Sequence, residues 1–122
     1  MAIKSAVIVI SQRKKMARYM AGEVFEVAFG SGGNTPEGNE IPPSEDATSL
    51  KKERFRKKIT SVNNEGLSLN ILTTLESDEL NGIDVSEVAI FDKNKNMIAI
   101  KTFKKIKKIV NIRYEFPFTL NF

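Results

Sequence analysis

Apolar residues that alternate with polar ones are the clearest pattern in the chain, and they concentrate in its second half. The stretch "GLSLNILTTLE" places Leu67, Leu69 and Ile71 on one face, which is the spacing of a half-buried strand. Two further strands are predicted at "VSEVAIF" and "MIAIKTF", and the polar run 92–96 between them suits a hairpin turn. A last strand is predicted over 112–122, where every second residue is apolar. Because proline donates no ladder hydrogen bond, Pro117 predicts that this strand lies at a sheet edge or carries a bulge.

The first third of the chain predicts a strand, a helix and a second strand. Residues 4–10 are rich in β-branched side chains, which favours a strand. Ser11 is a suitable N-cap for the helix predicted over 11–22, in which Met16, Tyr19 and Met20 follow helical spacing. Gly22 predicts the end of that helix, and "EVFEVAF" after it reads as a strand.

Between these halves the pattern stops. Residues 30–43 contain four glycines and three prolines without apolar periodicity, so 29–49 is predicted to be an extended loop or arm. "LKKERFRKKI" after it fits a short helix or the start of a strand. The sequence therefore predicts one domain over 1–122 with an α+β fold, a mostly antiparallel β-sheet with one or two short helices and a long Gly/Pro-rich connector.

Composition argues against an enzyme. The 122 residues include no histidine and no cysteine, which removes the commonest general base, the commonest zinc ligands and the thiol nucleophile. The glycine stretch lacks the lysine and hydroxyl that a phosphate-binding loop needs after its last glycine, and acidic residues and Pro42 and Pro43 follow instead. The acidic pairs Asp78 with Glu79 and Asp84 with Glu87 are interpreted as solvated loop charges. No catalytic residue, cofactor or metal is predicted.

The net charge of +4 is distributed in blocks, with acids gathered in 23–46 and 59–92 and bases in 51–58 and 101–108. Such blocks are typical of solvated surfaces, and they can also hold copies of one chain together. A third interpretation is a small basic nucleic-acid-binding module, since Phe55 and Phe103 interleave with the bases. The residues of that candidate basic patch are Lys51, Lys52, Arg54, Arg56, Lys57, Lys58, Lys104, Lys105, Lys107 and Lys108.

The order of segments resembles the domain at the start of phage tail-collar fibre proteins. The corresponding pieces are "ARYMAGEVFEVAFGSGG", "PPSEDATSLKKERFRKKI" and "VSEVAIFDKNKNMIAI", and together they span about 16–101. The last piece is the most specific, because a strand, a polar turn and a strand follow an acidic residue at the expected spacing. The glycine motif reads "GSGG" where "GDG" is usual in that family.

The resemblance implies a structural component of a phage or phage-like tail, as a fibre, collar or baseplate adaptor, that acts through protein–protein assembly. The implied partners are other tail or baseplate proteins and further copies of this chain as a homo-oligomer. The implied location is the tail particle, after synthesis in the bacterial cytoplasm and without a membrane. The candidate assembly residues are Phe29, Gly30, Gly32, Gly33, Pro42, Pro43, Phe116, Phe118 and Phe122.

Overall fold

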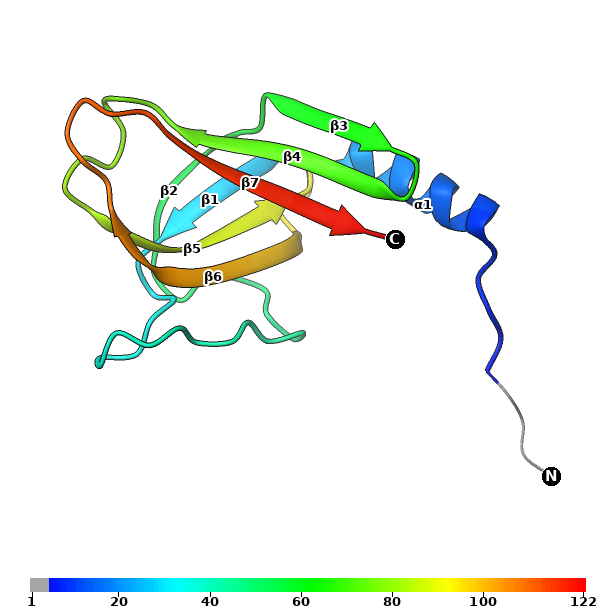
Figure 1. Cartoon of the computed structure of the whole chain (residues 1–122), viewed down its shortest axis with the longest axis horizontal. Helices are drawn as coiled ribbons and strands as arrows, with labels where there is room; N and C mark the ends of the chain where they lie inside the picture. Colours follow the sequence, from blue (N-terminus) through cyan, green and yellow to red (C-terminus); the bar gives the residue numbers. More distant parts are fainter. Residues whose placement is uncertain (1–4) are drawn as a thin grey trace.

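A computed structural model describes residues 5–122 as two antiparallel sheets and one helix (Figure 1). The first sheet has the strand order β2-β1-β5-β6 and the second has the order β3-β4-β7. The elements are α1 (Ile10–Glu23), β1 (Glu26–Gly30), β2 (Glu53–Lys58), β3 (Ser61–Glu65), β4 (Ser68–Leu75), β5 (Asp84–Phe91), β6 (Met97–Lys107) and β7 (Tyr114–Asn121). α1 is too short and too polar to cross a membrane, and no other helix occurs in the described residues.

The core lies between the two sheets. On β4 every second side chain is buried, and Leu69 and Ile71 pack against Phe29, Val88 and Ile90 of the first sheet. β2 and β3 follow one another across residues 59–60, so the sheets are joined at that side. β6 and β7 are the edge strands at the other side, where Phe103 of β6 approaches β7. A groove lies on this side, between β6 and β7.

Several predictions from the second half of the chain are confirmed. β5 and β6 form the predicted hairpin, in which the Asp92 N–H donates to Asn96 O at 2.9 Å and the Asp92 carboxylate accepts the N–H of Asn94 and Asn96. The strand that carries Pro117 is an edge strand, because β7 pairs only with β4. The segment 50–59 contributes strand β2 and no helix.

The N-terminal strand prediction is wrong. Residues 5–9 have no regular structure, and Ile10 already belongs to α1, while Lys4 lies outside the described residues. A β-branched run becomes a strand only beside a partner edge, and none lies next to this one within the described chain. The helix itself is confirmed, although Val9 and not Ser11 occupies its N-cap position.

The long Gly/Pro-rich connector predicted as part of the fold is also wrong. Residues 5–122 form a mostly antiparallel β-sheet fold with a single short helix, which is broadly compatible with the α+β class. Residues 31–52 are part of the folded body: they lie along the first sheet, where Leu50 packs on Ala89 and Phe91 of β5. The physical reason is a set of hydrogen bonds between residues 31–52 and side chains or backbone groups of β5 and β6.

Candidate functional site

The side chains of Ser86 and Glu87 hold the glycine-rich segment against the central strand β5. Glu87 is 1% exposed, and its carboxylate accepts backbone N–H groups from Gly32 (2.8 Å), Lys51 (3.0 Å) and Lys52 (2.9 Å). The Ser86 hydroxyl accepts the N–H of Gly33 at 2.8 Å. We call this group of contacts the Glu87 clamp. A buried carboxylate is costly unless several donors satisfy it, and here the backbone of the segment supplies them.

The Glu87 clamp requires glycine because the backbone comes so close to β5. A Cβ on Gly33 would overlap the backbone of Ser86, and a Cβ on Gly32 would lie 2.8 Å from the Glu87 oxygen that accepts its own N–H. A Cβ on Gly30 would likewise lie too close to the Glu87 side chain, at 2.5 Å from its Oε2. The three glycines predicted as assembly residues are therefore buried or half-buried parts of an internal contact. The interpretation of the acidic pairs as solvated loop charges is wrong for Glu87.

Further hydrogen bonds tie the same segment to β6. The side chain of Asn34 donates to Phe103 O at 2.8 Å and accepts the N–H of Lys105 at 2.9 Å. The Thr102 hydroxyl donates to Ile41 O at 2.7 Å. The prolines at 42 and 43 are exposed and border a shallow hollow of about 110 Å³. The polar backbone of residues 31–52 is thus bonded to two strands.

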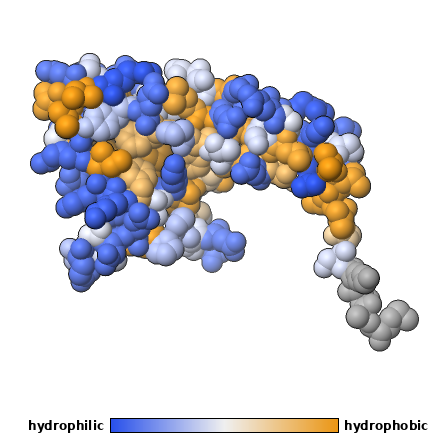
Figure 2. Space-filling view, in the orientation of Figure 1, coloured by the Kyte–Doolittle hydropathy of each residue, from blue (hydrophilic) through white to orange (hydrophobic). Residues whose placement is uncertain are grey.

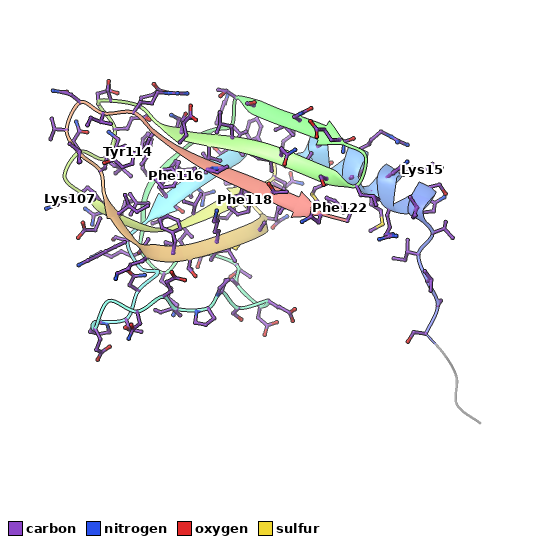
Figure 3. All side chains as sticks on the ribbon, viewed as in Figure 1. Lys15, Lys107, Tyr114, Phe116, Phe118 and Phe122 are labelled. Carbon is purple, nitrogen blue, oxygen red and sulfur yellow. The ribbon has the colours of Figure 1, made fainter. Side chains whose placement is uncertain are left out.

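The predicted aromatic residues divide into buried and half-buried positions. Phe29 is fully buried and Phe118 is 6% exposed, so both belong to the core. Phe116 is half-buried, with its ring centroid 5.5 Å from that of Phe29 and 5.7 Å from that of Phe103 across the gap between β7 and β6. Phe122 is half-buried and lines a hollow beside α1. Figure 3 shows Phe116 and Phe118 on β7, above β5 and β6.

An apolar groove of about 350 Å³ runs between β6 and β7. Its lining residues are Val88, Lys101, Phe103, Ile106, Tyr114, Glu115, Phe116, Pro117 and Phe118. The Lys101 side chain reaches from β6 to β7, where its ammonium donates to Pro117 O at 3.2 Å. We call this feature the β6–β7 groove. Two of its lining residues, Val88 and Phe118, belong to the core between the sheets.

Two bases of the candidate patch, Arg56 and Lys57, form ion pairs within the chain. Arg56 donates to Glu53 at 2.7 Å and lies 3.7 Å from Glu26, and these carboxylates raise the pKa of its guanidinium. The Lys57 ammonium pairs with Glu79 at 2.8 Å. Neither cation is free to bind a phosphate without giving up an internal partner.

The remaining bases are distributed unevenly. Lys108 is 1% exposed, and its ammonium donates to Asn81 at 3.0 Å. Lys52, Arg54 and Lys105 come from the two separate basic blocks and line one polar hollow of about 350 Å³. The structure brings these three together at one end of the first sheet. The others are exposed: Lys51, Lys58, Lys104 and Lys107.

The pKa of the Glu79 carboxyl group is lower than its ordinary value. Burial alone would raise its pKa, but hydrogen bonds from the Lys57 ammonium and the Glu76 N–H, with the charges of Lys57 and Lys108, lower it below the ordinary 4.5. Within residues 5–122 no group of three acidic, histidine or cysteine side chains is arranged to hold a metal ion. The Glu87 carboxylate accepts backbone N–H groups, and the Glu79 carboxylate pairs with Lys57.

The N-terminal residues present apolar surface that sequence reasoning did not identify. Val7 is 84% exposed, and Ile8, Val9 and Ile10 are each more than half exposed. On α1, only Ala17 is buried, and Tyr19 of the predicted apolar face is 70% exposed. Figure 2 shows this hydrophobic surface gathered at the N-terminal end, away from the sheets. The signal in the sequence was an apolar run without polar alternation, which we read as a strand.

Comparison with known protein families identifies one match over nearly the whole chain. The model of the family described as "Phage tail-collar fibre protein, N-terminal" matches residues 6–115. The match extends beyond the span 16–101 on which the resemblance rests, and it includes both the Glu87 clamp and the exposed N-terminal residues. A comparison with curated proteins found no match.

Proposed function

Because the chain belongs to the phage tail-collar fibre family, in which this region is the N-terminal domain, we propose that it attaches a fibre to the rest of a phage or phage-like tail. This is a family of structural tail proteins and not of enzymes. By its family, the chain is a structural phage tail-fibre protein. The finer role that we propose is that of a collar or baseplate adaptor, which works by contacts with other tail proteins.

The observation that carries this proposal is the exposed apolar N-terminal end. Val7 and Tyr19 are the most exposed large apolar side chains of the described chain. Fully burying one side chain of this size contributes about 1.5–3 kcal/mol, so a partner that covers several of them gains a substantial binding energy. Contiguous apolar surface of this kind marks protein–protein contact sites.

The organisation of the fold supports the same proposal. The sheets and the Glu87 clamp form a body in which backbone groups of Gly32, Gly33, Ile41, Lys51 and Lys52 are bonded to side chains of β5 and β6. α1 leads from that body toward the exposed segment (Figure 1). A stable body with an apolar extension is what an attachment domain needs, because the extension can bind a neighbour while the body keeps its fold.

The test is incorporation into tails. Particles are produced from a host whose copy of the gene is deleted, complemented with the wild-type chain or with variants, and the amount of this chain in purified tails is measured by immunoblot. We expect the double substitution Val7→Ser with Ile8→Ser to reduce incorporation at least about tenfold, which corresponds to about 1.4 kcal/mol. Val110→Ser is the matched control, since Val110 is 57% exposed but lies in the turn after β6.

Two results would contradict the proposal. One is absence of the wild-type chain from purified tails. The other is wild-type incorporation of the double variant. The basic-module alternative has less support, because Arg56, Lys57 and Lys108 are engaged within the chain. Binding of a short DNA duplex that weakens steeply as salt rises would restore it.

A further inference from the structure

We propose that the apolar N-terminal segment, residues 6–10, of one copy of the chain occupies the β6–β7 groove of a second copy. This inference rests on the proposed function and names a partner for the exposed surface that carries it. It joins two features of one chain: an extended apolar segment without a cover, and an apolar groove without an occupant, within the described residues.

The groove is built to receive apolar side chains. Its floor includes Val88 and Phe118 of the core, and its walls include Phe103, Ile106 and Phe116. Ile106 is 41% exposed, although it lies on the strand that borders the core. The groove therefore exposes to solvent an apolar surface that is continuous with the buried core between the sheets.

The segment has the matching chemistry and shape. It reads Ala-Val-Ile-Val-Ile, and its side chains from Val7 to Ile10 are exposed. Val9 has φ −66° and ψ 153°, which is extended backbone. Extended backbone sends successive side chains to opposite sides, so Val7 and Val9 enter a groove together, while Ile10 is the first residue of α1.

The position of α1 favours a groove in another copy. The 14 residues of α1 span about 21 Å and lead away from the end of the sheets where Phe122 lies beside Met16 and Met20. The segment before α1 continues away from the body (Figure 1). The β6–β7 groove lies on that body, alongside the strand that begins at Tyr114. To enter the groove of its own chain, the segment would have to turn back along the full length of α1.

The contact is expected to depend on side chains more than on an added strand. Pro117 has no N–H to offer at the free edge of β7, and its carbonyl already accepts the Lys101 ammonium. On β6 the N–H groups of Lys104 and Lys105 are bonded to Glu40 and Asn34. Ladder hydrogen bonding is thus interrupted on both strands, and the apolar lining supplies the attraction.

A segment of one copy in a groove of the next is a head-to-tail contact. Such contacts close into rings when the rotation permits and otherwise continue as open chains. Each copy donates one segment and receives one, so removing either the segment or the groove lining has the same effect on assembly.

The experiment is site-directed cross-linking between two differently tagged full-length chains. The chain has no cysteine, so each introduced thiol is unique. One pool carries Ile8→Cys, and the other carries Glu115→Cys at the exposed rim of the groove. The matched control replaces the second pool by Val110→Cys, a position that is more than half exposed and does not line the groove. We expect the mixed disulfide with Glu115→Cys to form at least about tenfold faster than the one with Val110→Cys, because binding raises the local concentration of the paired thiols.

A second measurement uses the mass in solution by light scattering. The wild-type chain is expected to be heavier than the 13.7 kDa monomer. Ile106→Asp, at an exposed position in the groove, and the double substitution Val7→Ser with Ile8→Ser are each expected to return it to a monomer that keeps the wild-type circular dichroism. Mixed disulfides at equal rates in both pools would contradict the inference.

Other outcomes separate this inference from the proposed function. A fast disulfide inside one chain that carries both Ile8→Cys and Glu115→Cys, in a monomer, would overturn the second copy as the occupant. A monomer at all concentrations whose double variant is still lost from tails would show that another tail protein covers the segment. That result overturns the inference and leaves the proposed function standing. Absence of the wild-type chain from tails removes the proposed function itself.

Discussion

The Glu87 clamp and the apolar N-terminal segment differ in whether their groups find a partner within the chain. In the clamp, a carboxylate that is 1% exposed finds three backbone donors and the polar segment 31–52 becomes part of the body. In the N-terminal segment, Val7 to Ile10 find no cover within the described chain. The composition of a segment is therefore a poor guide to its role. The glycine-rich stretch, which resembles a free connector, has an internal role, and the strand-like run at the start is available to a partner.

The largest expected effect comes from removing the clamp. Glu87→Ala leaves the N–H groups of Gly32, Lys51 and Lys52 without their acceptor, and each unsatisfied buried group costs about 1–3 kcal/mol. We expect the free energy of unfolding to fall by about 3 kcal/mol or more, measured by urea denaturation. Glu87→Gln keeps one acceptor oxygen and should lose less. A loss below about 1 kcal/mol for Glu87→Ala would show that the clamp is not what holds the segment.

A slightly smaller effect is expected from crowding the same contact. Gly33→Ala places a Cβ on the backbone of Ser86, so the segment must move away from β5. Overpacking of this kind costs about 1–3 kcal/mol. Gly22→Ala is the control, since a Cβ there meets nothing and alanine is the better helix former by about 1 kcal/mol. Equal stability changes of the same sign in both variants would refute the close approach at Gly33.

The ion pair of Glu79 with Lys57 gives a pH-dependent effect. The pKa of Glu79 is lower in the folded chain than its ordinary 4.5, so its ionisation stabilises the fold. That contribution is complete above pH 4.5 and is lost as the pH falls through the folded-state pKa. We expect Glu79→Gln to lose about 1 kcal/mol of unfolding free energy at neutral pH, and less at about pH 3. Asp78→Asn, on an exposed neighbour, is the control. An unchanged difference across that range would exclude the pair as the source.

The smallest effect on stability is expected at the N-terminal segment. Val7→Ser with Ile8→Ser changes exposed side chains, so the free energy of unfolding should stay within about 0.5 kcal/mol of the wild-type monomer. Incorporation into tails should nevertheless fall. A loss of stability as large as that of Glu87→Ala would show that the segment belongs to the folded body and is not a free contact surface.

Local patterns predicted the parts of the fold that depend on local physics. The β5–β6 hairpin follows from a polar turn in which the Asp92 carboxylate accepts the N–H groups of Asn94 and Asn96. Pro117 identified an edge strand because it lacks an N–H. The family also followed from local motifs, of which "VSEVAIFDKNKNMIAI" was the most specific.

The parts that sequence reasoning missed depend on distant partners. β3 was not predicted because Val62 is its one apolar residue, and it is a strand only by pairing with β4. No local pattern connects Gly32 with Glu87, which lies 55 residues away. From sequence alone, an acidic residue such as Glu87 is interpreted as a solvated charge, because the backbone N–H groups that it accepts lie far away in the chain. The β6–β7 groove likewise combines two strands that are separated by a turn and bonded to different neighbours.

The most direct measurement is hydrogen exchange of backbone amides in the isolated chain, in its monomeric state, and in purified tails. We expect the amides of Gly32, Gly33 and Lys52 to be protected in both states, because Ser86 and Glu87 hold them in either. We expect residues 6–10 to exchange rapidly in the monomer and to become protected in the tail. Equal exchange of 6–10 in both states, or rapid exchange of the glycine segment in the monomer, would contradict the division between an internal clamp and an external contact.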